Sequence, residues 1–104
     1  MKQSFILVAM AWLATFFAQA QAPSPADAMA LEQQGKLPEA ALAWKAITAH
    51  DPGDARAFAS LGVVLARQEK YAEAAAAYRK ALALDPKLAG IELNLGLAEF
   101  KRCV

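Results

Sequence analysis

The chain has 104 residues, with 11 Lys and Arg against 10 Asp and Glu, and a formal net charge of +1. A balance so close to neutral argues against a nucleic-acid partner, which requires a basic surface. One Cys and one His exclude an internal disulfide and give no cluster of metal ligands. The length suits one small domain.

Residues 1–20 are predicted to be a secretory signal peptide. Lys2 gives a positive start, residues 5–17 form an uncharged apolar run, and residues 18–20 are Ala-Gln-Ala. Such a signal would direct the protein to the periplasm or the medium, and cleavage after Ala20 would leave it without membrane attachment. The alternative is an uncleaved anchor, which the run disfavours because it is shorter than the ~20 residues that span a bilayer.

Removing this segment takes away Lys2 and no acidic residue, which leaves residues 21–104 formally neutral. This part of the chain opens with the signals of a helix start. Ser24 suits the N-cap, and Pro25 suits the first helical position. We expect the first helix to end near Gly35, which suits a C-terminal cap.

A second helix is predicted to open with Pro38, at a tolerated first-turn position. Its inward side carries Ala40, Trp44 and Ile47, and the Asp-Pro-Gly turn at residues 51–53 ends it. Trp44 is the largest residue that we expect to be buried.

A central pair of helices follows, and each helix has one apolar side. The first stripe consists of Phe58, Leu61 and Leu65, and the second of Tyr71, Ala74, Tyr78 and Ala81. Gly62 lies inside the first of these helices at a cost of about 1 kcal/mol relative to Ala. Such a Gly indicates a close approach, and we expect Ala74 to face it, with Tyr78 buried between the helices.

One fixed spacing relates these elements to one another. The Asp-Pro pair at residues 51–52 returns at 85–86, and the Leu-Gly pair at 61–62 returns at 95–96. The same interval separates both pairs, and a fixed period in this range is typical of a stacked helical array.

The pattern resembles the tetratricopeptide repeat (TPR). The residues that carry the resemblance are Phe58-x2-Leu61-Gly62-x2-Leu65, Ala74-x3-Tyr78-x2-Ala81 and Pro86. The resemblance implies an all-α, TPR-like α-solenoid of antiparallel helical hairpins in residues 21–104. The repeats are expected at about 21–54 and 55–88, with a partial repeat at 89–104.

Proteins of this family are non-enzymatic scaffolds that bind a peptide or protein in a concave groove, lined mainly by the first helix of each repeat. The resemblance places the following residues at the groove: Arg56, Ala59, Ser60, Val63, Arg67, Leu93, Asn94, Leu97 and Lys101. Some members clamp the terminal carboxylate of a chaperone tail with Lys, Asn and Arg side chains. Of the corresponding positions, Pro25, Met29, Ser60, Gly90 and Asn94, only Asn94 matches in type, so we predict no such clamp.

The last unit, expected to begin near Leu88, matches the first half of a repeat and leaves two interpretations open. It is either a terminal cap or an end without its partner helix, as in a truncated or self-associating fragment of a longer TPR protein. Its apolar residues occupy more than one face, which favours the second interpretation. We then expect self-association through residues 88–104, with at least one of these residues partly uncovered: Ile91, Leu95, Phe100 or Val104.

The sequence predicts no enzyme, no catalytic residue, no metal and no cofactor. His50 is expected in the last turn of a helix, where a cation suits the helix dipole. Cys103 cannot form an internal disulfide, so it either cross-links two chains or is incidental to a truncated end, and we favour the second interpretation. Neither residue lies in a nucleophile–base pattern, and no Gly-rich phosphate loop is present.

Overall fold

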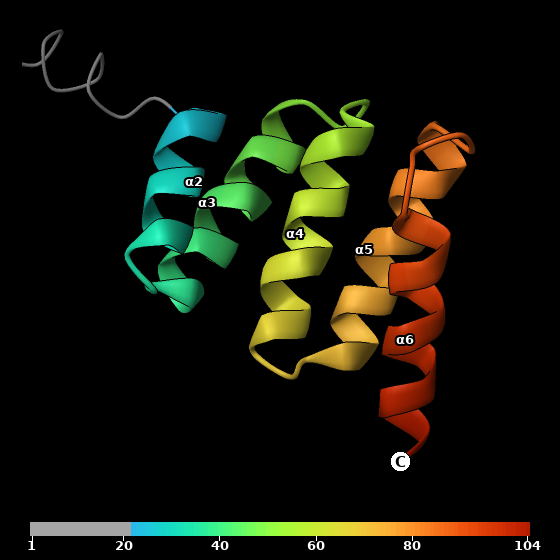
Figure 1. Cartoon of the computed structure of the whole chain (residues 1–104). Helices are drawn as coiled ribbons and strands as arrows, with labels where there is room; N and C mark the ends of the chain where they lie inside the picture. The colour runs from blue at the N-terminus through green and yellow to red at the C-terminus, as the bar shows by residue number, and fades with distance from the viewer. Residues whose placement is uncertain (1–21) are drawn as a thin grey trace, which may run out of the picture.

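The computed structural model describes residues 22–104, so the predicted signal peptide lies outside the described residues. Within them, five α-helices follow one another without a strand. The helices are α2 (Pro25–Gln33), α3 (Leu37–His50), α4 (Ala55–Arg67), α5 (Tyr71–Leu84) and α6 (Ile91–Cys103) (Figure 1). Each packs against its neighbours in the chain, and α4 also contacts α6. The predicted all-α solenoid of antiparallel hairpins is confirmed.

The predicted cap of α2 is present, and α4 begins with a comparable side-chain cap. The Oγ atom of Ser24 accepts a hydrogen bond from the backbone N–H of Asp27 at 3.2 Å, and the Asp27 carboxylate accepts the Ser24 N–H at 3.0 Å. This reciprocal pair is a capping box, and it satisfies two backbone donors at the helix start. At the start of α4, the Asp54 carboxylate accepts the Ala57 N–H at 3.1 Å.

Both hairpins turn through the same C-terminal motif. After α2, Gly35 adopts φ +75°, and the N–H of Lys36 donates to the carbonyl of Leu31 at 2.9 Å. After α4, Glu69 takes the equivalent position at φ 63°, and Lys70 donates to Leu65 at 2.9 Å. These are Schellman turns, whose left-handed residue is usually Gly because a side chain is strained there.

The start of α6 differs from the expected position near Leu88. The helix begins at Ile91, after Gly90 with φ 79°. Leu88 takes the place in its repeat that Asp54 takes in the preceding one, but it has no side-chain acceptor for a helix N–H. The chain therefore continues through a turn before the helix forms.

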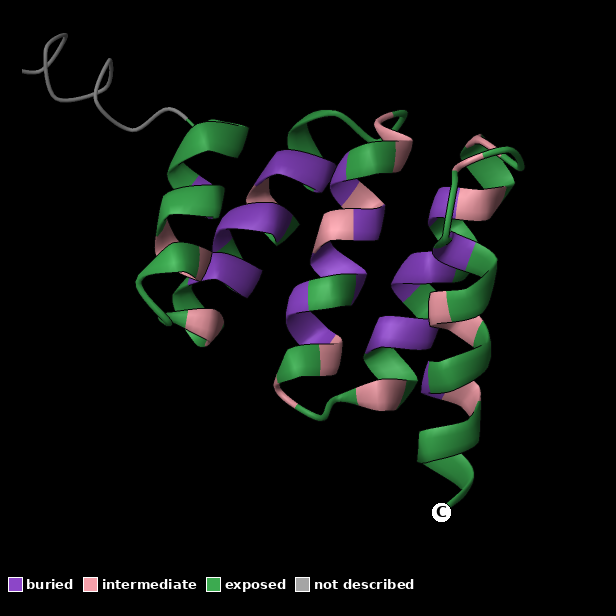
Figure 2. Ribbon diagram, viewed as in Figure 1, coloured by how far each residue is buried: buried purple, intermediate pink, exposed green. Residues whose placement is uncertain are grey.

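The core lies between neighbouring helices (Figure 2). Trp44 is 3% exposed and Tyr78 is 2% exposed, as predicted. The side chain nearest to Gly62 is Tyr78, whereas the sequence pointed to Ala74. A Cβ atom at Gly62 would lie 2.5 Å from Cε1 of Tyr78, and its three nearest atoms all belong to that ring. Gly62 therefore leaves room for an aromatic ring, which a side chain at this position would displace.

The prediction that the last helix is left partly uncovered is confirmed, at Phe100 and Val104 rather than at Ile91. Ile91 is buried, because it lies on the side of α6 that packs against α5. Leu95 is half-buried against the core. Phe100, however, is 68% exposed and Val104 is 93% exposed, at the end of α6 where Figure 2 shows mainly exposed residues.

Candidate functional site

The exposed side of α2, α4 and α6 repeats from one unit to the next. Met29, Val63 and Leu97 occupy equivalent positions on these three helices, and all three are exposed apolar residues. One helical turn further on, the equivalent positions carry exposed polar residues: Gln33, Arg67 and Lys101. The first helices of the three units therefore present matching pairs of side chains.

A hollow of about 430 Å³ lies between α4, α5 and α6. Its lining consists of Val63, Ala66, Arg67, Tyr71, Tyr78, Asn94, Leu97, Ala98 and Lys101. A second hollow of about 380 Å³ joins α2 to α4 and is lined by Met29, Glu32, Gln33 and Arg67. Because Arg67 lines both hollows, they form one surface across the first helices. We call this surface the groove.

Five of the nine residues that the sequence predicts for this site line the groove. They are Val63, Arg67, Asn94, Leu97 and Lys101. Arg56, Ser60 and Leu93 do not line either hollow. Ala59 is 8% exposed and belongs to the core, so it offers almost no surface to a ligand.

The sequence reasoning missed the contributions of α2 and α5. Met29 and Gln33 line the groove from α2, and the repeat period would have found them from Val63 and Arg67. Tyr71 enters from the second helix of its hairpin, where the period alone gives no signal that a side chain reaches the groove.

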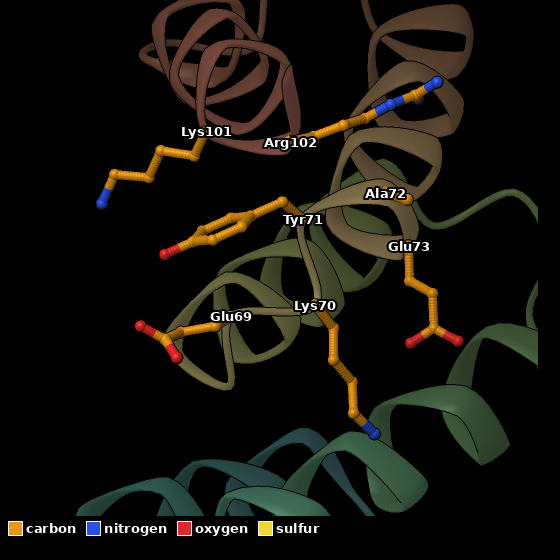
Figure 3. A pocket seen from close by; sticks show the side chains of 7 residues that line it. All are labelled: Glu69, Lys70, Tyr71, Ala72, Glu73, Lys101 and Arg102. Carbon is orange, nitrogen blue, oxygen red and sulfur yellow. The ribbon is translucent and has the colours of Figure 1, made fainter. Parts of the chain in front are cut away.

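The open end of the groove is a third hollow, of about 500 Å³ (Figure 3). Tyr71 and Lys101 line both this hollow and the main one. The Nζ atom of Lys101 lies 5.4 Å from the centre of the Tyr71 ring, which is a cation–π contact. In Figure 3 the side chains of Lys101, Tyr71 and Glu69 reach toward the same open side.

Two cations of the groove have no carboxylate partner among residues 22–104. The ion pairs found there join Glu99 to Arg79 and to Arg102. Neither Arg67 nor Lys101 takes part in one. The groove therefore has a line of exposed apolar side chains beside a line that includes the two cations Arg67 and Lys101.

The nearest acidic side chain of α2 is held by the core. Glu32 accepts a hydrogen bond from the indole N–H of Trp44 at 2.8 Å. This bond satisfies the buried indole and links α2 to α3, a contact that the sequence analysis did not anticipate.

The groove offers little for proton transfer or metal binding. Burial raises the pKa of Tyr78 above its ordinary value of 10.0, so this phenol stays neutral at physiological pH. No group of three His, Cys, Asp or Glu side chains that could hold a metal is found in the described part of the chain. His50 ends α3 and is exposed, and Cys103 is a free, exposed thiol.

Stacked helical hairpins with a groove along their first helices define an α-solenoid scaffold. The tetratricopeptide repeat family model matches residues 26–89, which is more than half of the chain, and the chain belongs to that family. Its repeats are a non-catalytic type that mediates protein–protein interaction. A search of curated proteins found no match. Among the helices described, none is long and apolar enough to cross a membrane.

Proposed function

We propose that the protein is an exported scaffold that binds a peptide or a protein segment in the groove. The observation that carries this proposal is the continuity of the groove, which Arg67 joins across α2, α4 and α6. Exposed Met29, Val63 and Leu97 line it without serving the core, and exposed apolar residues gathered in one place usually mark an interaction surface.

The test uses a photocrosslinking residue at Val63 in the groove and, as control, at Leu42 on α3. Leu42 is an exposed apolar residue that lines neither hollow. A partner crosslinked only from Val63 in source-cell extracts is then purified, and its affinity is measured. We expect Leu97→Glu to weaken that binding at least tenfold, and Leu42→Glu to leave it unchanged. Equal effects of both substitutions would refute binding at the groove.

Export is proposed from the sequence of residues 1–20, which has the charged start, apolar run and small residues of a signal peptide. The expected mature protein begins at Gln21. Intact-mass measurement of protein recovered from the periplasm or medium tests this. A mass that still includes this N-terminal segment would contradict cleavage.

A second candidate function is self-association through α6. Phe100 and Leu93 are each 68% exposed, and a Cβ atom at Gly96 would meet nothing within 4 Å. At the equivalent Gly62 in α4, the Tyr78 ring covers the helix surface. The surface of α6 at Gly96 has no such cover. Sedimentation across a concentration series should show oligomers that Phe100→Lys dissociates. A monomer at every concentration would exclude this candidate.

A further inference from the structure

The groove carries two parallel rows of side chains with different chemistry. The apolar row consists of Met29, Val63 and Leu97, and the polar row of Gln33, Arg67 and Lys101. Within each helix the two members are one turn apart, so they lie side by side on one face. All six side chains are exposed.

The polar row has two cations, one amide and no carboxylate. In residues 22–104 no salt bridge neutralises Arg67 or Lys101. The acidic residues nearest to the row are Glu32, which lines the hollow beside Arg67 and is hydrogen-bonded to Trp44, and Glu69, which lies in the turn at the open end. Neither forms an ion pair with Arg67 or Lys101. The charge of this row is local, since the whole chain carries only +1.

We infer that the ligand of the groove is an acidic peptide segment that also carries apolar side chains. This inference rests on the proposed groove function and names the class of its partner. The apolar side chains of the ligand pack on Met29, Val63 and Leu97. Its Asp or Glu carboxylates contact the Arg67 guanidinium and the Lys101 ammonium, and Gln33 supplies a neutral amide donor.

The pairing of the two rows distinguishes this ligand from a polyanion. Two cations give little affinity for nucleic acid, whose binding grows with the number of phosphates that are neutralised. The apolar row would remain uncovered by such a ligand. A peptide with both kinds of side chain covers both rows, and the carboxylates set its orientation across the groove.

The experiment uses short labelled peptides in matched versions, with the same leucines and with Glu, Gln or Lys at the remaining positions. Fluorescence anisotropy against the full chain measures each affinity. We expect the Glu version to bind most tightly and the Lys version most weakly. The preference should shrink as salt is raised, because the Debye length falls from about 10 Å at 0.1 M to about 3 Å at 1 M.

Substitutions assign this preference to the polar row. Arg67→Gln and Lys101→Gln should each weaken the Glu version by about two- to fivefold, the effect of one exposed ion pair. Lys45→Gln is the matched control, because it removes the same charge from an exposed residue that lines neither hollow of the groove. Arg67→Glu should reverse the preference in favour of the Lys version.

The outcomes separate this inference from the groove function. If all versions bind equally and Leu97→Glu still abolishes binding, the groove binds apolar peptides and the acidic class is overturned. If Lys45→Gln weakens binding as much as Arg67→Gln does, the polar row is not the determinant. If no version binds, or if Leu97→Glu has no effect, both the groove function and the acidic ligand class are refuted. Thermal melts of each variant establish that it is folded.

Discussion

Two glycines at equivalent positions of successive repeats should respond in opposite ways to the same substitution. Gly62 and Gly96 each lie in the interior of a helix, in α4 and α6. Helix propensity alone predicts that replacement by Ala stabilises both by about 1 kcal/mol. The structure predicts a difference, because Tyr78 covers Gly62 while the space beside Gly96 is open.

The size of the difference follows from the contact. A Cβ atom at Gly62 would lie 2.5 Å from one Tyr78 ring carbon and 2.6 Å from another, so the ring or a helix must move. Overpacking of this kind costs about 1–3 kcal/mol. After the gain in helix propensity, Gly62→Ala should lower the free energy of unfolding by up to about 2 kcal/mol. Gly96→Ala should raise it by about 1 kcal/mol.

Urea unfolding followed by circular dichroism measures both variants against the parent chain. A thermal melt gives an independent value, since about 1 kcal/mol shifts Tm by about 4–8 °C in a domain of this size. Low protein concentration keeps any association through α6 from contributing to the result.

A double-mutant cycle identifies the ring as the cause. In a Tyr78→Leu background the ring is absent, so Gly62→Ala should cost much less, with a coupling energy of about 1–3 kcal/mol. Stabilisation by Gly62→Ala equal to that by Gly96→Ala, or a coupling energy near zero, would refute the reasoning.

Two further predictions concern the turns and the pH dependence. Glu69→Gly should stabilise the protein by about 0.5–1 kcal/mol in urea unfolding, because it removes the backbone strain of a left-handed non-glycine residue. Gly35→Ala should destabilise it by a similar amount, because it introduces that strain. A loss of stability in Glu69→Gly would contradict this. The pKa of Asp27 lies below 3.8 because its carboxylate accepts the backbone N–H and then the side-chain hydrogen bond of Ser24. The ionised Asp27 therefore contributes stability above pH 3.8, and this stability is lost as the pH falls through the lower folded-state pKa. Unfolding curves of Asp27→Asn should accordingly show a weaker loss of stability in acid than those of the parent chain. The raised pKa of Tyr78 affects stability in alkali. The neutral phenol contributes stability below pH 10.0, and this stability is lost as the pH rises through the folded-state pKa. Tyr78→Phe should reduce that alkaline loss in unfolding curves.

Much of the fold could be predicted from local signals. The Ser24 cap, the Asp54 cap and the turn at Gly35 depend on residues within one helical turn, so the sequence contains the whole interaction. The repeat period added the equivalence of the units, and that equivalence predicts the α-solenoid. It also predicted Trp44 and Tyr78 as buried residues.

The site was less predictable, because its members come from three units. Val63, Arg67 and Leu97 follow from their position on the first helices, but Tyr71 reaches the groove from α5. Ala59 was assigned to the groove although it is buried. Residues only a few positions apart on a helix face different neighbours, and the rotation of that helix decides which of them reaches solvent.

The sequence by itself determined that the chain folds into stacked helices, the cap at Ser24 and the order in which the helices stack, since these depend on neighbours along the chain and on a fixed period. Only the tertiary structure decided that the Tyr78 ring covers Gly62, and that Ile91 is buried while Phe100 is exposed. The period states which positions are equivalent, but it does not state what lies opposite them. That depends on how closely the helices pack and on which face of each helix has a partner.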